Sequence, residues 1–283
     1  MQTGVTGNAL DFSFQSYSDI PRVLEDFSAS CAGAATINPE NCPLAAASAQ
    51  SNDSANDILN RIYYIFSNLS SQPFVLNPDP NGTIYTFESS ATDIVAHLAI
   101  PSLWNFVAQR LLDMETAIHA NSNQFSRRSV PLNFSSFNRR DLFSNNFVPQ
   151  AVGCLDANYS DISTPNQFLE YLSQNLNQNA LIGFQGIQAA TCLNWPNLGS
   201  HDVQAYRTSF PSSLKTPILI IAEVDDPLNA YSGVLATFDY IGAHNTRLLT
   251  HDGIGHGWYL SPNNCTLNGI KEFYRNGEVR SNI

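Results

Sequence analysis

Acidic residues and a histidine stand near the C-terminal end of the chain in an arrangement suited to acid–base chemistry. Glu223-Val-Asp225-Asp226-Pro227 follows one apolar run, and Gly253-Ile-Gly255-His256-Gly257 follows the next. An imidazole can take a nucleophile's proton, while a carboxylate fixes the opposite ring nitrogen as donor and stabilises the imidazolium. Flanking glycines let the histidine loop approach a site closely. Asp226 and His256, 30 residues apart, are therefore the predicted acid and base of a catalytic triad.

Other assignments of the acid and the base are open. Asp226 is preferred to Asp225 because it directly precedes Pro227, although sequence separates adjacent acids poorly. His251 and Asp252 compete for the same roles, and His251 should lie within or at the rim of a strand. Taken singly, an Asp-Asp-Pro is usually a turn and a histidine is more often structural. Their joint placement after two successive buried strands favours catalysis.

The elements that must position these residues follow from the apolar pattern. Residues 216–222 form a continuous β-branched run opened by proline, typical of a parallel strand buried on both faces. Three elements should follow: a helix over 229–241, a strand over 246–250 and a closing helix over 264–274. This order is typical of the end of a parallel α/β sheet, where ligands bind at the carboxyl ends of the strands. An α/β-hydrolase supplies its triad acid and histidine in this way.

The residues upstream show helical periodicity instead. Apolar residues recur at three- and four-residue spacing over 54–69 and again over 91–118, where Pro101 should kink or restart the helix. We also expect a loop over 74–87, a helix over 167–176 and a connector over 195–213. Because two strands cannot make such a sheet alone, the neighbours of the two predicted strands are missing from this pattern.

Composition excludes several classes of partner. The chain of 283 residues has 13 Lys and Arg against 24 Asp and Glu, a net charge of −11. A nucleic-acid binder needs a basic stripe, and these scattered cations do not supply one. Binding to anionic membranes is disfavoured for the same reason, and no apolar run approaches the roughly 18 residues that span a bilayer. We therefore expect neither a nucleic-acid nor a membrane partner.

Cysteines and sequons bear on the compartment. Cys31 and Cys42 lie 11 residues apart across a Gly/Pro/Asn-rich connection, which suits a local disulfide better than a metal site, with free thiols as the alternative. The first residues lack the basic and apolar regions of a signal peptide. Six sequons are glycosylation candidates, but 30 asparagines give about that many by chance: Asn52, Asn68, Asn81, Asn133, Asn158 and Asn264.

The C-terminal motifs resemble a known family. "TPILIIAEVDDPLNAYSG", "DGIGHGWYLSPNNCT" and "IKEFYRNGEV" are similar to the C-terminal domain of secreted tripeptidyl-aminopeptidase-like serine peptidases, which are related to proline iminopeptidases. The resemblance extends upstream to the segments around Cys31 and Cys42, Pro101 to Trp104, Cys154, and Cys192 to Pro196. It implies an α/β-hydrolase core with a helical cap, release of residues or short peptides from free N-termini, and secretion. It assigns the triad acid to Asp226 and the base to His256.

One departure from the family is decisive for activity. The family's nucleophile sits in a G-x-S-x-G elbow, and no such pentapeptide occurs in the 283 residues. The elbow and the oxyanion-hole loop would precede Met1, so we expect an incomplete α/β-hydrolase that is inactive alone, since loss of a triad serine lowers the rate by several orders of magnitude. The expected division is a core-strand remnant (1–15), a helical cap with its return connector (16–213), and the C-terminal α/β-hydrolase segment (214–283).

The expected chemistry is thus that of a secreted serine exopeptidase lacking its serine. A peptide substrate would be bound only after completion by an N-terminal half, and triad chemistry needs no metal or organic cofactor. Glu170, Glu223 and other cap acids are candidates for holding a substrate's amino terminus. Cys154 and Cys192 are the second expected disulfide pair, and Cys265, or another cysteine, is expected to have its partner in the missing half. Two alternatives stay open: a non-catalytic binding protein on a degenerate scaffold, and an esterase or lipase of the same fold.

Overall fold

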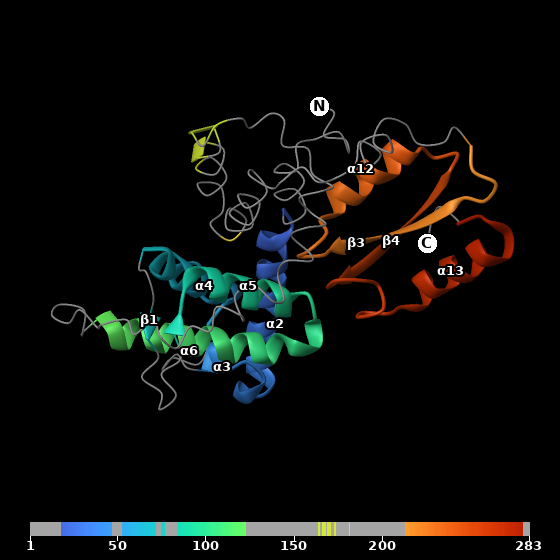
Figure 1. Ribbon diagram of the computed structural model, residues 1–283. Coiled ribbons are helices and arrows are strands. Elements are labelled where there is room, and N and C mark those ends of the chain that lie inside the picture. Colours follow the sequence, from blue (N-terminus) through green and yellow to red (C-terminus); the bar gives the residue numbers. More distant parts are fainter. Residues whose placement is uncertain are drawn as a thin grey trace, which may run out of the picture.

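A computed structural model describes the chain in two main parts, a helical part and a C-terminal α/β part (Figure 1). The described residues are 18–46, 53–71, 75–76, 84–122, 164, 166–167, 169–170, 173, 181 and 213–279. Several expectations lie outside them: the strand remnant over 1–15, most of the helix over 167–176, the connector over 195–212, Cys154, Cys192, and the sequons at Asn52, Asn81, Asn133 and Asn158.

The helical part is built from amphipathic helices that share one apolar core. Its elements are α2 (Ile20–Ile37), the 3₁₀ turn η1 (Pro39–Asn41), α3 (Pro43–Ala46), α4 (Ala55–Ser71), α5 (Phe87–Leu98), the 3₁₀ turn η2 (Pro101–Leu103) and α6 (Trp104–Ser122). On α4 the predicted apolar face is buried, at Ile58, Ile62, Ile65 and Leu69. Pro101 opens η2 and so separates α5 from α6, as the sequence predicts.

Local interactions fix this part as well. The expected disulfide between Cys31 and Cys42 is present, with the two Cα atoms 5.3 Å apart, and it joins α2 to the residue before α3. Phe27 packs edge-on against Trp104, with ring centroids 5.6 Å apart. Arg61 Nε of α4 donates a hydrogen bond to Glu115 Oε1 of α6 at 3.0 Å. The disulfide and these side-chain contacts hold α2, α4 and α6 together around the core.

Two features of the helical part differ from expectation. The loop expected over 74–87 contains a short antiparallel pairing of β1 (Val75–Leu76) with β2 (Ile84–Tyr85). Helix α2 is absent from the sequence prediction, although the spacing of its buried residues Ile20, Val23, Leu24 and Phe27 is helical. None of the helices among the described residues is long and apolar enough to cross a bilayer.

The α/β part follows the predicted order of elements. These are β3 (Ile218–Asp225), α12 (Tyr231–Ile241), β4 (Thr246–Ile254) and α13 (Asn264–Asn276), and Figure 1 shows the two helices on either side of the strands. β3 and β4 pair in parallel, from Ile218 opposite Thr246 to Glu223 opposite His251, with an irregularity before Asp225. Helix α13 ends at Gly277, which adopts a left-handed conformation with φ 75°.

The prediction that β3 is buried on both faces is wrong for the described residues. Ile218 is 39% exposed, and Leu219, Ile220 and Ile221 are only half-buried. The physical reason is that β3 pairs with β4 on one edge, and no other described strand pairs with it. Helix α12 likewise has no fully buried residue, although it is mostly apolar. The sheet edge therefore shows apolar surface where a larger parallel sheet would continue.

Three contacts join the helical part to the carboxyl end of β3 and to the loop after β4. Asp19 Oδ2 accepts a hydrogen bond from the backbone N–H of Tyr231, 2.8 Å away, at the first turn of α12. Arg22 Nε lies 2.6 Å from Asp225 Oδ1. The carbonyl of Ala99 accepts from the backbone N–H of His256 at 2.8 Å. The helical part thus rests on the end of the sheet that carries the predicted acid and base.

Candidate active site

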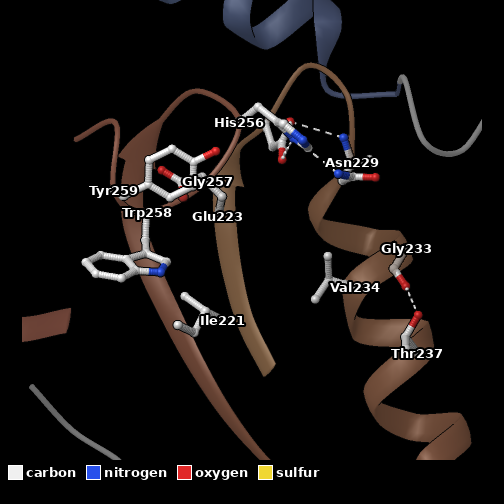
Figure 2. Close-up of a pocket in the computed structure, with 12 residues that line it drawn as sticks. Ile221, Glu223, Asn229, Gly233, Val234, Thr237, His256, Gly257, Trp258 and Tyr259 are labelled. Atoms are coloured by element: carbon white, nitrogen blue, oxygen red, sulfur yellow. Dashed lines mark hydrogen bonds and ion pairs between the residues drawn. The ribbon is translucent and has the colours of Figure 1, made fainter. Parts of the chain in front are cut away.

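The structure brings the predicted acid and base together. His256 Nδ1 lies 3.0 Å from Asp226 Oδ2 and 3.3 Å from Oδ1. The Asp226 side chain is 6% exposed, whereas that of His256 is 44% exposed. A proton on Nδ1 is therefore shared with a buried carboxylate, and Nε2, on the opposite side of the ring, is left as the proton acceptor. Figure 2 shows His256 beside Asn229, near the end of β3.

Local backbone geometry positions Asp226. It follows the last residue of β3, and its Oδ1 accepts the backbone N–H groups of Leu228 at 2.8 Å and Asn229 at 3.1 Å. This Asx turn orients the carboxylate, because a side chain bonded to its own turn has few other rotamers open to it. The side-chain amide of Asn229 lies 3.2 Å from His256 Nδ1, on the same side of the ring.

The adjacent acids, which sequence separates poorly, have different partners. Asp225 lies beside Arg22 of α2, and Asp226 beside His256. Burial raises the pKa of Asp225, and the Arg22 guanidinium partly offsets this by favouring the charged form. Asp225 therefore serves contact with the helical part, and Asp226 is the acid of the pair.

Glycines at the histidine loop allow its close approach to the helical part. Gly255 and Gly257 have φ of 117° and 108°, values that disfavour any side chain. A Cβ on Gly255 would lie 2.9 Å from both the Ala99 carbonyl oxygen and Pro101 Cδ. Gly255 thus allows the close approach to the helical part, whereas a Cβ on Gly257 would meet the Tyr259 ring of the same loop.

The competing histidine belongs to a separate, buried cluster. His251 is fully buried in β4, its Nδ1 lies 2.5 Å from Thr266 Oγ1, and its Nε2 lies 3.2 Å from Ser261 Oγ. Ser261 Oγ donates to Glu223 Oε1 at 3.3 Å. Burial is the largest cause raising the pKa of Glu223 to about 7, with smaller contributions from the nearby Asp225 and Asp226. His251 makes no contact with Asp226 among the described residues.

A cavity of about 390 Å³ opens beside the pair. Its lining includes the carboxyl groups of Glu223 and Asp226, the His256 ring, and apolar side chains from β3, α12 and the loop after β4 (Figure 2): Ile221, Ala230, Val234, Trp258 and Tyr259. The acid–base pair is thus at the wall of a space large enough for a small ligand group.

The other candidates lie apart from this site. Glu170 is exposed and does not line the cavity. Asp252 is also exposed. Asn68 lies within α4 and donates to the Tyr64 carbonyl, and Asn264 is exposed at the start of α13. No cluster of metal ligands occurs among the described residues.

Sequence reasoning missed three residues at or near the site. Asp19 and Arg22 reach it from more than 200 residues away in the chain, and no local pattern signals such contacts. Asn229, beside His256, could have been found from its place three residues after Asp226, where an Asx turn directs the chain back toward the acid.

Comparison with known families agrees with this geometry. Residues 177–282 match the family model described as TAP-like protein, and the match contains β3, β4, Asp226 and His256. This C-terminal segment is therefore similar to the TAP-like domain of α/β-hydrolases. No match was found among curated proteins. The match to the TAP-like domain supports the hydrolase class and the partial α/β fold, a small parallel pair of strands beside a mostly helical part.

Proposed function

We propose that this chain is the acid–base and cap portion of a secreted serine exopeptidase that cleaves peptides from their free N-terminus. The hydrogen-bonded pair of Asp226 and His256 carries the proposal, with Nδ1 and Oδ2 3.0 Å apart at the end of a parallel strand. The match to a TAP-like domain supports the hydrolase class. The resemblance of the motifs supports the peptidase type and the secretion, and the six sequons are candidate sites for glycosylation.

In the proposed mechanism each residue has one task. A serine Oγ attacks the scissile carbonyl while His256 Nε2 takes its proton, and the charge of Asp226 stabilises the resulting imidazolium. The imidazolium then gives this proton to the leaving amine, and the acyl-enzyme is hydrolysed by water with His256 again as base. Among the described residues no serine hydrogen-bonds to His256, and no G-x-S-x-G elbow occurs in the sequence. We therefore propose that the nucleophile comes from a preceding N-terminal half.

Hydrolysis by the extended protein tests the proposal. The transcript upstream of Met1 is sequenced, and any in-frame segment with a G-x-S-x-G motif is expressed together with this chain. We expect hydrolysis of peptide arylamides with a free N-terminus, and loss of about 10⁴-fold in kcat on His256→Ala or Asp226→Asn. His251→Gln is the matched control and should keep most of the kcat. Hydrolysis that survives His256→Ala would contradict the assignment.

Labelling of the chain on its own tests the missing nucleophile. A fluorophosphonate should not label this chain, because the reagent needs an activated serine. Strong labelling that is lost on mutating one serine of these residues would place the nucleophile within the chain. Hydrolysis of esters but not peptides by the extended protein would favour the esterase alternative, and the absence of any upstream coding segment would favour the non-catalytic one.

A further inference from the structure

Glu223 is a buried carboxyl group that the proposed triad does not use. Its side chain is 4% exposed. Oε1 accepts from Ser261 Oγ at 3.3 Å and lies 3.5 Å from His251 Nε2. Oε2 is buried and has no hydrogen-bond partner among the described residues. A buried carboxyl oxygen without a partner is costly unless it is protonated or meets a cation.

Glu223 is also one of the residues that line the cavity beside the acid–base pair. Glu223, Asp226 and His256 line one 390 Å³ space, and none of the described residues that line it is Lys or Arg. The other walls are aliphatic, from Ile221 and Val234, or aromatic, from Trp258 and Tyr259 (Figure 2). Aromatic rings favour a cation at their faces, and aliphatic walls favour an apolar group. The cavity thus offers acidic and apolar surface to one ligand.

We propose that this cavity binds the primary ammonium group of a ligand through Glu223 Oε2, with an apolar side chain of the ligand against Ile221, Val234 and the aromatic rings. The proposal rests on the proposed function, for which it names the group that recognises a substrate's free amino end. It also explains why a strand end carries a third carboxyl besides Asp225 and Asp226.

No described side chain uses the hydrogen-bonding capacity of Glu223 Oε2. His251 cannot serve it, because its Nε2 faces Oε1 and Ser261, and its Nδ1 is held by Thr266. The titratable groups near Glu223 are Asp225 at the end of β3, Asp226 directly after it, His251 on β4, and His256 and Tyr259 on the loop after β4. An ammonium group at Oε2 would replace the proton that burial favours on this carboxyl.

Calorimetric titration of the full chain with L-leucinamide at pH 7.5 tests the proposal. The matched ligand is N-acetyl-L-leucinamide, which has the same side chain and no ammonium group. We expect at least tenfold weaker binding of the acetylated ligand, because a charge-assisted hydrogen bond is lost. Glu223→Gln should weaken leucinamide binding by at least tenfold and leave the acetylated ligand unchanged. Nα-acetyl-lysinamide, which offers only a side-chain ammonium, shows which source of ammonium the cavity prefers.

Two further variants separate recognition from general effects. Asp239→Asn removes one exposed charge from α12 and should change leucinamide binding less than twofold. Ser261→Ala removes the donor to Oε1 but leaves Oε2, so binding should stay within about threefold of the original chain. Equal affinity for both leucinamides, unchanged affinity in Glu223→Gln, or no binding at millimolar leucinamide would overturn the proposal. Because binding needs no nucleophile, these results are independent of the hydrolysis tests above.

Discussion

Arg22 Nε lies 2.6 Å from Asp225 Oδ1, and this ion pair joins helix α2 to the last residue of β3. The next residue, Asp226, turns to His256. The two adjacent carboxylates thus have different partners. Asp225 contacts the helical part, and Asp226 contacts the His256 ring. Four predictions follow from this division and from the contacts around it.

The first prediction concerns the ion pair itself. Arg22→Gln and Asp225→Asn should each destabilise the chain, and a double-mutant cycle should give a coupling of about 1 kcal/mol, since Asp225 is nearly buried while Arg22 is half-exposed. Chemical unfolding measures the four free energies. The surface pair of Arg247 and Glu278 is the control and should show a smaller coupling. A coupling of zero for Arg22 and Asp225 would mean that the pair does not hold α2 to the sheet.

The second prediction concerns Asp226 as the centre of its turn. Asp226→Ala leaves two backbone amides and His256 Nδ1 without their acceptor, so the free energy of unfolding should fall by about 2–3 kcal/mol. Asp226→Asn retains an oxygen for the amides and should lose about 1 kcal/mol less. Equal losses in the two variants, measured by chemical unfolding, would contradict the role of the turn.

The third prediction concerns Gly255. Alanine there would adopt φ near 117° and bring its Cβ within 2.9 Å of the Ala99 carbonyl, so we expect a loss of about 2–3 kcal/mol in unfolding free energy. Gly33→Ala is the matched control, because its Cβ would meet nothing within 4 Å inside α2. That variant should be stabilised by up to about 1 kcal/mol. A harmless Gly255→Ala would show that the loop need not approach the helical part.

The fourth prediction concerns pH. Burial raises the pKa of Glu223 to about 7 from its ordinary value of 4.5, so the folded state holds this proton more tightly than the unfolded state. The contribution of Glu223 is therefore most favourable below pH 4.5 and declines as pH rises to 7, by up to about 3 kcal/mol. Glu223→Gln should remove this decline and be more stable than the original chain at pH 8. The same pH dependence of the unfolding free energy in both proteins would contradict this prediction.

The acid–base pair could be predicted from sequence because its signals are local. Each residue follows an apolar run, and parallel strands bring their carboxyl ends to one edge. Strand β4 extends beyond the predicted range of 246–250, to Ile254. It includes His251, whose ring nitrogens lie within hydrogen-bond distance of Thr266 and Ser261. A polar residue so placed interrupts the apolar pattern that marks a strand in sequence.

The contact of α2 with the sheet and the exposure of β3 could not be predicted, because both depend on residues that are distant in the chain. Arg22 and Asp225 are 203 positions apart, and no local pattern in the sequence indicates that α2 contacts the end of β3. The partial exposure of β3 also could not be read from its sequence, since a β-branched run indicates a strand that suits burial, not the neighbours that bury it.

The hydrogen bond from His256 N–H to the Ala99 carbonyl has a consequence for protein engineering. A chimera that exchanges the helical part for that of a relative keeps the histidine loop in place only if the donor supplies an equivalent carbonyl beside Pro101, together with counterparts of Asp19 and Arg22. The two parts are therefore not interchangeable modules, and recombination between such proteins should yield folded products chiefly when these contacts are inherited as one set.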